Sequence, residues 1–508
     1  MADSIDDAGT SPQPSLRRTT VRGARLAFIG YASSRAITFF TYAALARLVS
    51  PSDFGRYAAA SVIVGVGGLF AESGMMSALI RRPDRIEEAA SSAFFSLLIG
   101  GTLLSLAALA VSPAMGLLFS REHVVALTAA LAPGMLVRSM MVVPDALLQR
   151  RFSFARRVAV DPLGSIAFAV GSIVSCANGA GAWGLVIGFH ASQLTQAISG
   201  WAFARFRPRR RLASFAMWRE LAAFARHVLA SEVLSRTATQ IDAVMLGRFA
   251  GAAPLGQYRN GLRLAQQPSD AVIGVGAYVL LPALARLADH PRRLSSAARN
   301  VLRVISTAMI PISLSLLVLG EQAAILLLGR RWSAAGHVIA ALFAFVWSAS
   351  IISVCSEVFK AVNRPQNLVR MHSVSLITLA AFVSLGAITI GAVGVAGAVS
   401  LSYALTASYA LYLALPSIQL RFRDWFMDAA APLAAAAAMA GAMFAFSLAV
   451  DPLHQPLVGA WALTAAEAVL GAGVYLTALA AIDPGRRDAA RSYLRRGRGE
   501  KSALMRAG

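Results

Sequence analysis

Long apolar segments constrain this sequence more than any other feature. Residues 97–111, 302–319, 378–401 and 429–450 are nearly free of charged side chains. A helix that crosses a bilayer needs about 20 predominantly apolar residues. Backbone N–H and C=O groups must be paired in lipid, and no short alternating strands of a barrel are visible, so these segments should be helices. The sequence therefore predicts an all-α polytopic membrane protein.

The composition agrees with a membrane protein and argues against two other classes. Hydrophobic residues make up 57% of the chain and charged residues 14%, whereas a typical soluble domain has roughly 25% charged residues. The net charge of +22 would suggest nucleic acid in a soluble protein. Here the charges lie between apolar segments, so membrane lipids are the expected partner and nucleic acid is not. The two cysteines have no metal-type spacing and support no disulfide framework.

The charge pattern orients the predicted spans. We place about fourteen spans, of which the seventh and eighth are the most polar, at residues 24–48, 57–79, 92–112, 124–147, 158–176, 183–203, 220–247, 257–284, 301–319, 334–358, 371–390, 393–415, 428–450 and 458–481. Most of the 47 Lys and Arg residues fall in alternate connections. The opposite connections hold only Arg56, Arg121, Arg248, Arg330 and Arg331. Because basic connections favour the cytoplasm, both termini should be cytoplasmic.

An internal repeat divides the spans. Residues 45–58 (LARLVSPSDFGRYA) match residues 246–259 (LGRFAGAAPLGQYR) at an offset of 201, which pairs Gly55 with Gly256 and Tyr57 with Tyr258. Both copies lie at a span, a short external turn and the next span, so span one is equivalent to span seven. We read the matching glycines as structural. The repeat predicts two pseudo-symmetric lobes of about six helices each, in one orientation, plus two C-terminal helices.

This division predicts the domains. They are a disordered cytoplasmic N-terminus at 1–20, an N-lobe at 21–204, a basic cytoplasmic linker at 205–219, a C-lobe at 220–417, two further helices at 418–482 and a basic cytoplasmic tail at 483–508. Two parallel lobes leave a cleft between them, which is typical of a transporter because substrate sites lie at repeat interfaces. A duplicated scaffold without a pore is the alternative.

Charged residues inside spans indicate where a site could lie, because they are costly in lipid and face a cavity or a partner. They concentrate in spans one, two, four, seven and eight. Symmetry-related arginines facing a cleft suit an anion such as phosphate. The expected substrate-binding residues are Arg35, Arg236, Arg263 and Arg226. The expected coupling or ion-pair residues are Glu72, Glu232 and Asp242.

Structural alternatives remain open for these residues. Arg35 could pair with Glu72 as a bridge, and Glu232 could neutralise Arg236 four residues later on one helix face. Arg259, near the start of its span, is expected to extend to the external interface. No P-loop, HExxH, GxSxG or His/Cys cluster occurs, so we expect a transporter rather than an enzyme, with no metal or cofactor. A proton or a sodium ion remains open as the coupling ion.

Several motifs resemble a known family. They are LARLVSPSDFGRYA (45–58), GLFAESGMMSALIRR (68–82), LLQRRFSFARR (147–157), GAWGLVIG (181–188), QIDAVMLGRFAGAAPLGQYRNGLRLAQQP (240–268) and LLPALARL (280–287). Over residues 20–370 the chain resembles the Wzx-type polysaccharide flippases. That family belongs to the superfamily that also holds MATE exporters and lipid II flippases. Residues 371–508 resemble it only in hydropathy.

The resemblance implies a function. It implies a flippase that moves an undecaprenyl-diphosphate-linked oligosaccharide across the bacterial inner membrane by alternating access, for exopolysaccharide, capsule or O-antigen biosynthesis. A polysaccharide polymerase and export machinery are implied partners. One alternative is an ion-coupled small-molecule exporter of MATE-like type. Another is a membrane polymerase or ligase acting on lipid-linked sugars, although such enzymes need a larger external loop than this chain offers.

Overall fold

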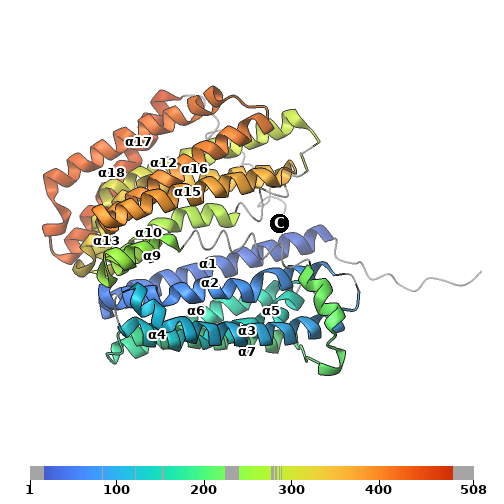
Figure 1. Ribbon diagram of the computed structural model, residues 1–508. Coiled ribbons are helices and arrows are strands. Elements are labelled where there is room, and N and C mark those ends of the chain that lie inside the picture. Colours follow the sequence, from blue (N-terminus) through green and yellow to red (C-terminus); the bar gives the residue numbers. More distant parts are fainter. Residues whose placement is uncertain are drawn as a thin grey trace, which may run out of the picture. The chain divides into compact units, whose positions relative to one another are not determined.

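The computed structural model describes residues 16–82, 84–119, 122–150, 154–223, 240–275, 280, 283–284, 286–287 and 289–483. Within these ranges the regular elements are helices and no strand occurs, which confirms the all-α prediction (Figure 1). The first half contains α1 (Leu16–Leu48), α2 (Pro51–Arg81), α3 (Ile86–Leu118), α4 (Glu122–Leu131), α5 (Pro133–Arg150), α6 (Phe154–Ala177), α7 (Ala182–Ala204) and the 3-10 turn η1 (Arg210–Leu212). The second half contains α9 (Ile241–Phe249), α10 (Ala252–Val275), α12 (Pro291–Leu328), η3 (Arg330–Trp332), α13 (Ser333–Ala341), α14 (Phe343–Ala361), α15 (Pro365–Thr389), α16 (Ala392–Ser417), α17 (Phe422–Val450), η4 (Pro452–His454) and α18 (Leu457–Ile482).

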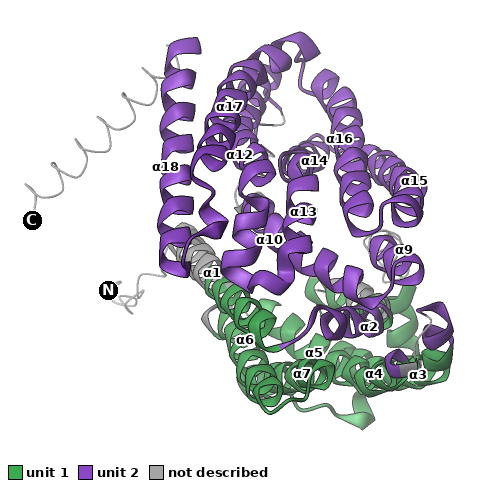
Figure 2. Cartoon of the chain, turned by 90° about the vertical axis from the view of Figure 1, so that its left-hand side faces the viewer, with its two compact units in different colours: residues 1–48, 63–113, 125–234 green, residues 49–62, 114–124, 235–508 purple. Residues whose placement is uncertain are grey.

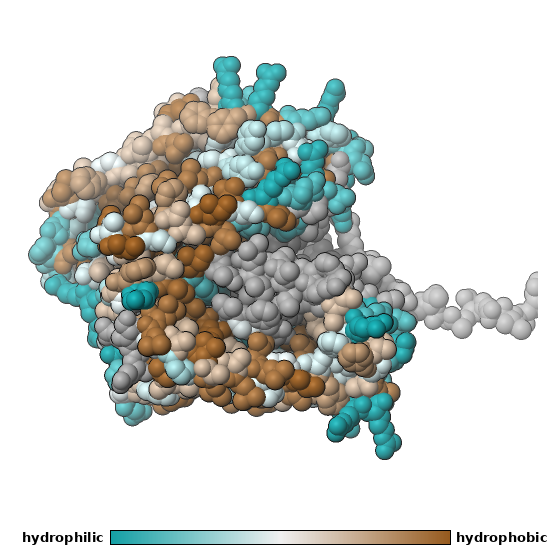
Figure 3. All heavy atoms as spheres, viewed as in Figure 1, coloured by the Kyte–Doolittle hydropathy of each residue, from teal (hydrophilic) through white to brown (hydrophobic). Residues whose placement is uncertain are grey.

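Many helices are long and apolar enough to cross a membrane. Nine stretches in the described ranges meet that standard by length and composition. The polar helix α10 is not among them, in line with the predicted weakness of the eighth span. The number of fourteen spans stays a prediction. Large apolar side chains such as Leu103, Ile388 and Val469 are exposed, and brown hydrophobic surface covers much of the face in Figure 3. Lipid is the solvent in which such a surface is stable.

Two of the predicted spans, at residues 124–147 and 334–358, each contain a break in the helix, although residues 123–150 still form one stretch that could cross a membrane. The first break lies at Ala132 between α4 and α5, and the second lies at Leu342 between α13 and α14. The first has a local cause, because Pro133 has no N–H and disfavours helical backbone in the residue before it. The second has no proline, so only its packing distinguishes it from a continuous helix.

The two breaks have the same hydrogen bonds. The N–H of Ala132 donates to the carbonyl oxygens three and four residues earlier, at 3.3 and 3.1 Å, and the N–H of Leu342 does the same at 3.1 and 3.0 Å. A serine hydroxyl from another helix then donates to a carbonyl oxygen at each break, Ser105 to Ala132 at 2.9 Å and Ser400 to Ala341 at 2.7 Å. The backbone hydrogen bonds at the two breaks are therefore alike, whereas the serines come from helices that the repeat does not make equivalent, α3 and α16.

The chain forms two compact units, coloured in Figure 2. Unit 1 contains residues 1–48, 63–113 and 125–234, and unit 2 contains residues 49–62, 114–124 and 235–508. Within unit 1, α6 and α7 form a hairpin, as α15 and α16 do within unit 2. Glycines with positive φ, Gly181 at 52° and Gly391 at 72°, precede α7 and α16. The predicted boundaries of the lobes stay predictions.

The matching glycines of the repeat meet inside unit 2. A Cβ at Gly55 in α2 would collide with the carbonyl oxygen of Ala252, and a Cβ at Gly256 in α10 would collide with that of Pro51. The first turns of α2 and α10 therefore pack backbone against backbone, which only glycine allows. Phe54 packs next to this crossing against the buried ring of Trp332, with 5.3 Å between ring centroids. This contact gives both glycines the structural role expected of them.

The last two helices belong to unit 2. Apolar side chains of α17 and α18, among them Met439, Met443 and Tyr475, pack against Ile310 of α12. The Tyr475 hydroxyl donates to the carbonyl oxygen of Thr307 at 2.6 Å. The C-terminal helices are thus an integral part of this unit.

Candidate functional site

Helix α10 carries a polar stripe along one side. Arg259, Arg263, Gln266 and Asp270 are spaced by four, three and four residues, so they line one face of the helix. We call these four residues the polar stripe. On the opposite, apolar side, Gly261 and Ala265 are buried, and a Cβ at Gly261 would meet Ala335 and Val338 of α13. The packing of the apolar side therefore determines which way the charged side faces.

A buried cluster lies at the N-terminal end of the stripe, where α9 meets α10. The hydroxyl of Tyr258, which is fully buried, donates to Asp242 Oδ2 at 2.7 Å. The N–H of Ala243 donates to the other carboxylate oxygen of Asp242 at 2.7 Å. Arg259 Nη2 donates to Gln240 Oε1 at 2.7 Å and lies 3.8 Å from Asp242 Oδ1. One acid and one base therefore neutralise each other in a buried, hydrogen-bonded network.

This cluster lines a cavity of about 180 Å³ within unit 2. Gln240 and Gln266 contribute amides to its wall, and Tyr403 and Phe345 contribute aromatic rings whose centroids are 4.6 Å apart. Amides, a guanidinium and aromatic rings can together bind hydroxyl-rich or anionic groups by hydrogen bonds and ring contacts.

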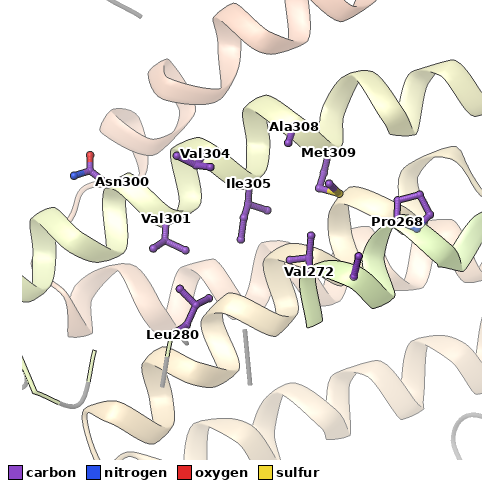
Figure 4. A pocket seen from close by; sticks show the side chains of 10 residues that line it. Pro268, Val272, Leu280, Asn300, Val301, Val304, Ile305, Ala308 and Met309 are labelled. Atoms are coloured by element: carbon purple, nitrogen blue, oxygen red, sulfur yellow. The ribbon is translucent and has the colours of Figure 1, made fainter. Parts of the chain in front are cut away.

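An apolar groove lies on another side of α10, between α10 and α12 (Figure 4). Its volume is about 510 Å³, and Asn300 is the one polar residue among the described residues of its lining. On α10 the groove is lined by Pro268, Ala271 and Val272, which point away from the polar stripe by the helical spacing. Ile305 of α12 points toward Val272 in Figure 4. Helix α10 therefore separates a polar surface from an apolar one.

The predicted site residues have different outcomes. Asp242 belongs to the buried cluster, and Arg263 is a half-buried member of the polar stripe. Arg35 is exposed on α1 in unit 1. Glu72 lies within α2, but its side chain lies outside the described part of the structure. Arg226, Glu232 and Arg236 lie outside the described residues, together with the predicted Glu232–Arg236 pair.

The position of Arg259 relative to the external interface stays a prediction. Its guanidinium donates to Gln240 Oε1 and lies 3.8 Å from Asp242 Oδ1, so it is part of the cluster. Its acidic partner, Asp242, comes from the preceding helix α9 and not from α10. A signal was present in the repeat. At the offset of 201, Asp242 corresponds to Thr41 and Tyr258 corresponds to Tyr57. Only the second copy therefore has an acid at this position together with the tyrosine.

Unit 1 contains an ion pair of its own. Arg157 Nε in α6 lies 2.7 Å from Asp145 Oδ1 in α5. Both side chains are partly exposed, so this pair contributes only modestly to stability. It links the two helices that follow the break at Ala132.

The family described as polysaccharide biosynthesis protein matches residues 44–337. The succinoglycan biosynthesis transport protein ExoT of Rhizobium meliloti (strain 1021) is 26% identical over 67% of this chain and 68% of its own length. The lipopolysaccharide biosynthesis protein WzxC of Escherichia coli (strain K12) is 21% identical over 63% of this chain and 65% of its own length. The chain thus spans about two thirds of the curated relatives it matches.

Solved structures resemble the fold. The lipid II flippase MurJ in an inward closed conformation matches with a TM-score of 0.74, at 13% identity over 91% of this chain and 99% of that one. An inward-facing MATE family multidrug resistance transporter matches with a TM-score of 0.63, at 14% identity over 77% of this chain and 98% of that one. At these identities the likeness concerns the fold alone.

Proposed function

Because this chain belongs to the polysaccharide biosynthesis protein family, we propose that it is a flippase for an undecaprenyl-diphosphate-linked oligosaccharide. Its place is the bacterial inner membrane, with both termini in the cytoplasm, and its product serves exopolysaccharide, capsule or O-antigen assembly. It works as a transporter by alternating access rather than as an enzyme. A polymerase and export machinery would take the translocated unit.

The arrangement around α10 is the observation that carries this proposal. A lipid-linked oligosaccharide is amphipathic, with a charged diphosphate, a hydroxyl-rich sugar and a polyprenyl chain. Helix α10 offers a guanidinium-bearing stripe and a polar, aromatic-lined cavity on one side, and an apolar groove on another. Arg263 lies within the stripe one turn after Arg259, and we assign its guanidinium to the diphosphate.

The remaining site assignments are part of the same proposal. Arg35, Arg226 and Arg236 would add positive charge toward the diphosphate, and Glu72, Glu232 and Asp242 would take part in ion coupling or ion pairs. A proton or a sodium ion would drive the cycle. Asp242 already has Tyr258 and Arg259 as partners, so its role in coupling would require this network to open.

The test uses a strain of the source bacterium that lacks the gene and carries a plasmid copy. Deletion should abolish one surface polysaccharide and leave its lipid-linked precursor accessible only from the cytoplasmic side. Arg263→Gln should reproduce that defect at normal protein level, whereas Arg292→Gln, an exposed arginine at the start of α12, should restore full output. Normal polysaccharide in the deletion strain would refute the proposal.

A MATE-like exporter of small molecules is the second candidate, because the fold resembles MATE transporters. A cationic drug needs an acid that is not already neutralised. Asp242 is the one acid among the described residues that line the cavity, and it is paired with Arg259. Resistance of the deletion strain to cationic drugs should therefore be unchanged. A drug-sensitive strain with normal polysaccharide would favour the exporter.

A further inference from the structure

Residues 205–223, which follow α7 directly, form a strongly basic segment. It contains six arginines and one acid, Glu220. The sequence predicts a linker at this position, and in the structure it is packed onto unit 1. We call residues 205–223 the basic segment.

Its first part is bound to the start of α3. The N–H of Arg209 donates to Ser91 Oγ at 3.3 Å, and the N–H of Ser214 donates to Ser92 Oγ at 2.9 Å. Both serines are buried. Arg209 Nη1 also lies 3.2 Å from Glu87 Oε2. Two backbone hydrogen bonds to buried hydroxyls fix the path of this segment along α3.

Its second part, residues 215–223, is helical and has two different faces. Met217 and Leu221 are buried in the core of unit 1. On the outer face, Phe215 is 74% exposed and its ring centroid lies 5.1 Å from that of Trp218. Arg219 also lies on that outer face by the helical spacing. The inner face of this helix is thus anchored in the core, and its outer face exposes the ring of Phe215 and the guanidinium of Arg219.

The arginines at this surface are available for a partner. Arg207, Arg210, Arg211 and Arg219 are exposed, and within the described ranges none of these four has an ion-pair partner. The segment carries six arginines against one acid, so its surface has a net positive charge. A partner that brings negative charge and an apolar contact for the ring of Phe215 would fit this surface.

We propose that the basic segment is a binding surface for anionic phospholipid headgroups, such as phosphatidylglycerol, of the bilayer that holds the protein. The segment begins at the residue after α7, so its arginines lie within a few residues of a helix in the apolar bundle. Guanidinium groups bind phosphate through paired N–H donors, and aromatic rings are enriched at the headgroup level. The charge and the exposed ring together match a phospholipid surface better than a nucleic acid or a soluble protein.

Because Ser91, Ser92 and the buried Met217 hold the basic segment on α3, lipid bound there is held by unit 1. Anionic lipid should therefore stabilise unit 1 through this segment. The inference does not depend on the proposed substrate.

The experiment measures which lipid gathers at the segment in the full-length protein. Ala213 is exposed, and Cys176 and Cys355 are buried, so Ala213→Cys accepts one donor fluorophore. The protein is placed in phosphatidylcholine nanodiscs with a trace of acceptor-labelled phosphatidylglycerol or acceptor-labelled phosphatidylcholine. We expect energy transfer to phosphatidylglycerol to exceed that to phosphatidylcholine and to fall as ionic strength rises.

Charge-removal variants assign the effect to the segment. Replacing Arg207, Arg210 and Arg211 by Gln should cut the enrichment on the order of a hundredfold, because each basic residue near an anionic surface favours it about fivefold. The matched triple, Arg292→Gln, Arg293→Gln and Arg423→Gln, removes the same charge from exposed positions in unit 2 and should leave the enrichment unchanged.

Three results would overturn the proposal. They are equal transfer to both labelled lipids, an equal loss in the two triple variants, and displacement of the labelled lipid by inorganic phosphate at constant ionic strength. A further variant tests the anchoring. Ser91→Ala with Ser92→Ala keeps every arginine but should abolish the rise in the melting temperature of unit 1 that phosphatidylglycerol causes. An unchanged rise would show that the segment acts without its contacts to α3.

Discussion

Asp242→Asn removes a charge from the buried cluster and keeps the shape of the side chain. Breaking a buried ion pair by removing one partner costs about 3–5 kcal/mol. The Arg259 side chain is 25% exposed and keeps its hydrogen bond to Gln240, so solvent and that bond offset part of the cost. We expect a net loss of about 2 kcal/mol. For a unit of this size that corresponds to a fall in melting temperature of roughly 4 °C.

The two buried cysteines supply the assay. Cys355 belongs to a hydrophobic core of unit 2, and Cys176 lies in unit 1. A dye that reacts only with exposed thiols therefore reports the unfolding of unit 2 in a Cys176→Ser background and of unit 1 in a Cys355→Ser background. Asp242→Asn should lower the melting temperature of unit 2, which Cys355 reports, more than that of unit 1, which Cys176 reports. Asp289→Asn, which alters an exposed acid in the same unit, should leave it unchanged.

A double-mutant cycle tests whether Asp242 and Tyr258 stabilise unit 2 through their shared hydrogen bond. Tyr258→Phe deletes the hydroxyl that donates to Asp242 and should cost about 2 kcal/mol, as expected for a hydrogen bond to a charged group. Because both variants disrupt the same bond, the double variant should cost less than the sum of the two. Strict additivity, or a wild-type melting temperature for Asp242→Asn, would show that the cluster does not stabilise unit 2 as described.

Two further predictions concern the glycine crossing and the apolar groove. Gly55→Ala and Gly256→Ala should each destabilise the protein by about 1–3 kcal/mol in the same dye assay, because the new Cβ overlaps a facing carbonyl oxygen, whereas Gly473→Ala, which meets nothing within 4 Å, should not. Ala308→Trp should fill the apolar groove and lower surface polysaccharide at normal protein level, whereas Ala380→Trp, at an exposed position of α15, should not. Unchanged output from Ala308→Trp would remove the groove from the proposed transport route.

Much of the fold could be predicted because its signals are local. Apolar segments of sufficient length must be helices in lipid, whatever their neighbours are. The pairing of Gly55 with Gly256 was visible as an internal repeat, since equivalent backbone contacts require the same residue in both copies. The family was also recognisable from motifs in residues 20–370, and the match over residues 44–337 confirms it.

The helix breaks and the site were less predictable because they depend on contacts between separate helices. Pro133 could have indicated the first break, but the second, at Leu342, has no proline and is distinguished only by its packing. The partner of Arg259 could not be assigned from its own helix, because Asp242 comes from α9. The basic segment gave the same difficulty, since six arginines after the end of a helix indicate a flexible linker as readily as an anchored surface.

The sequence by itself determined that this chain is a helical membrane protein built from a duplicated unit and related to polysaccharide flippases. Hydropathy, the order of charges and the repeated glycines can be read from the chain alone. In lipid the apolar segments must then form helices. Only the tertiary structure decided that Asp242, Tyr258 and Arg259 neutralise one another, that α10 separates a polar from an apolar surface, and that the basic segment is held on α3. The reason is that side-chain pairing over a few ångströms depends on how helices pack, and helix packing brings together residues that are distant in the sequence.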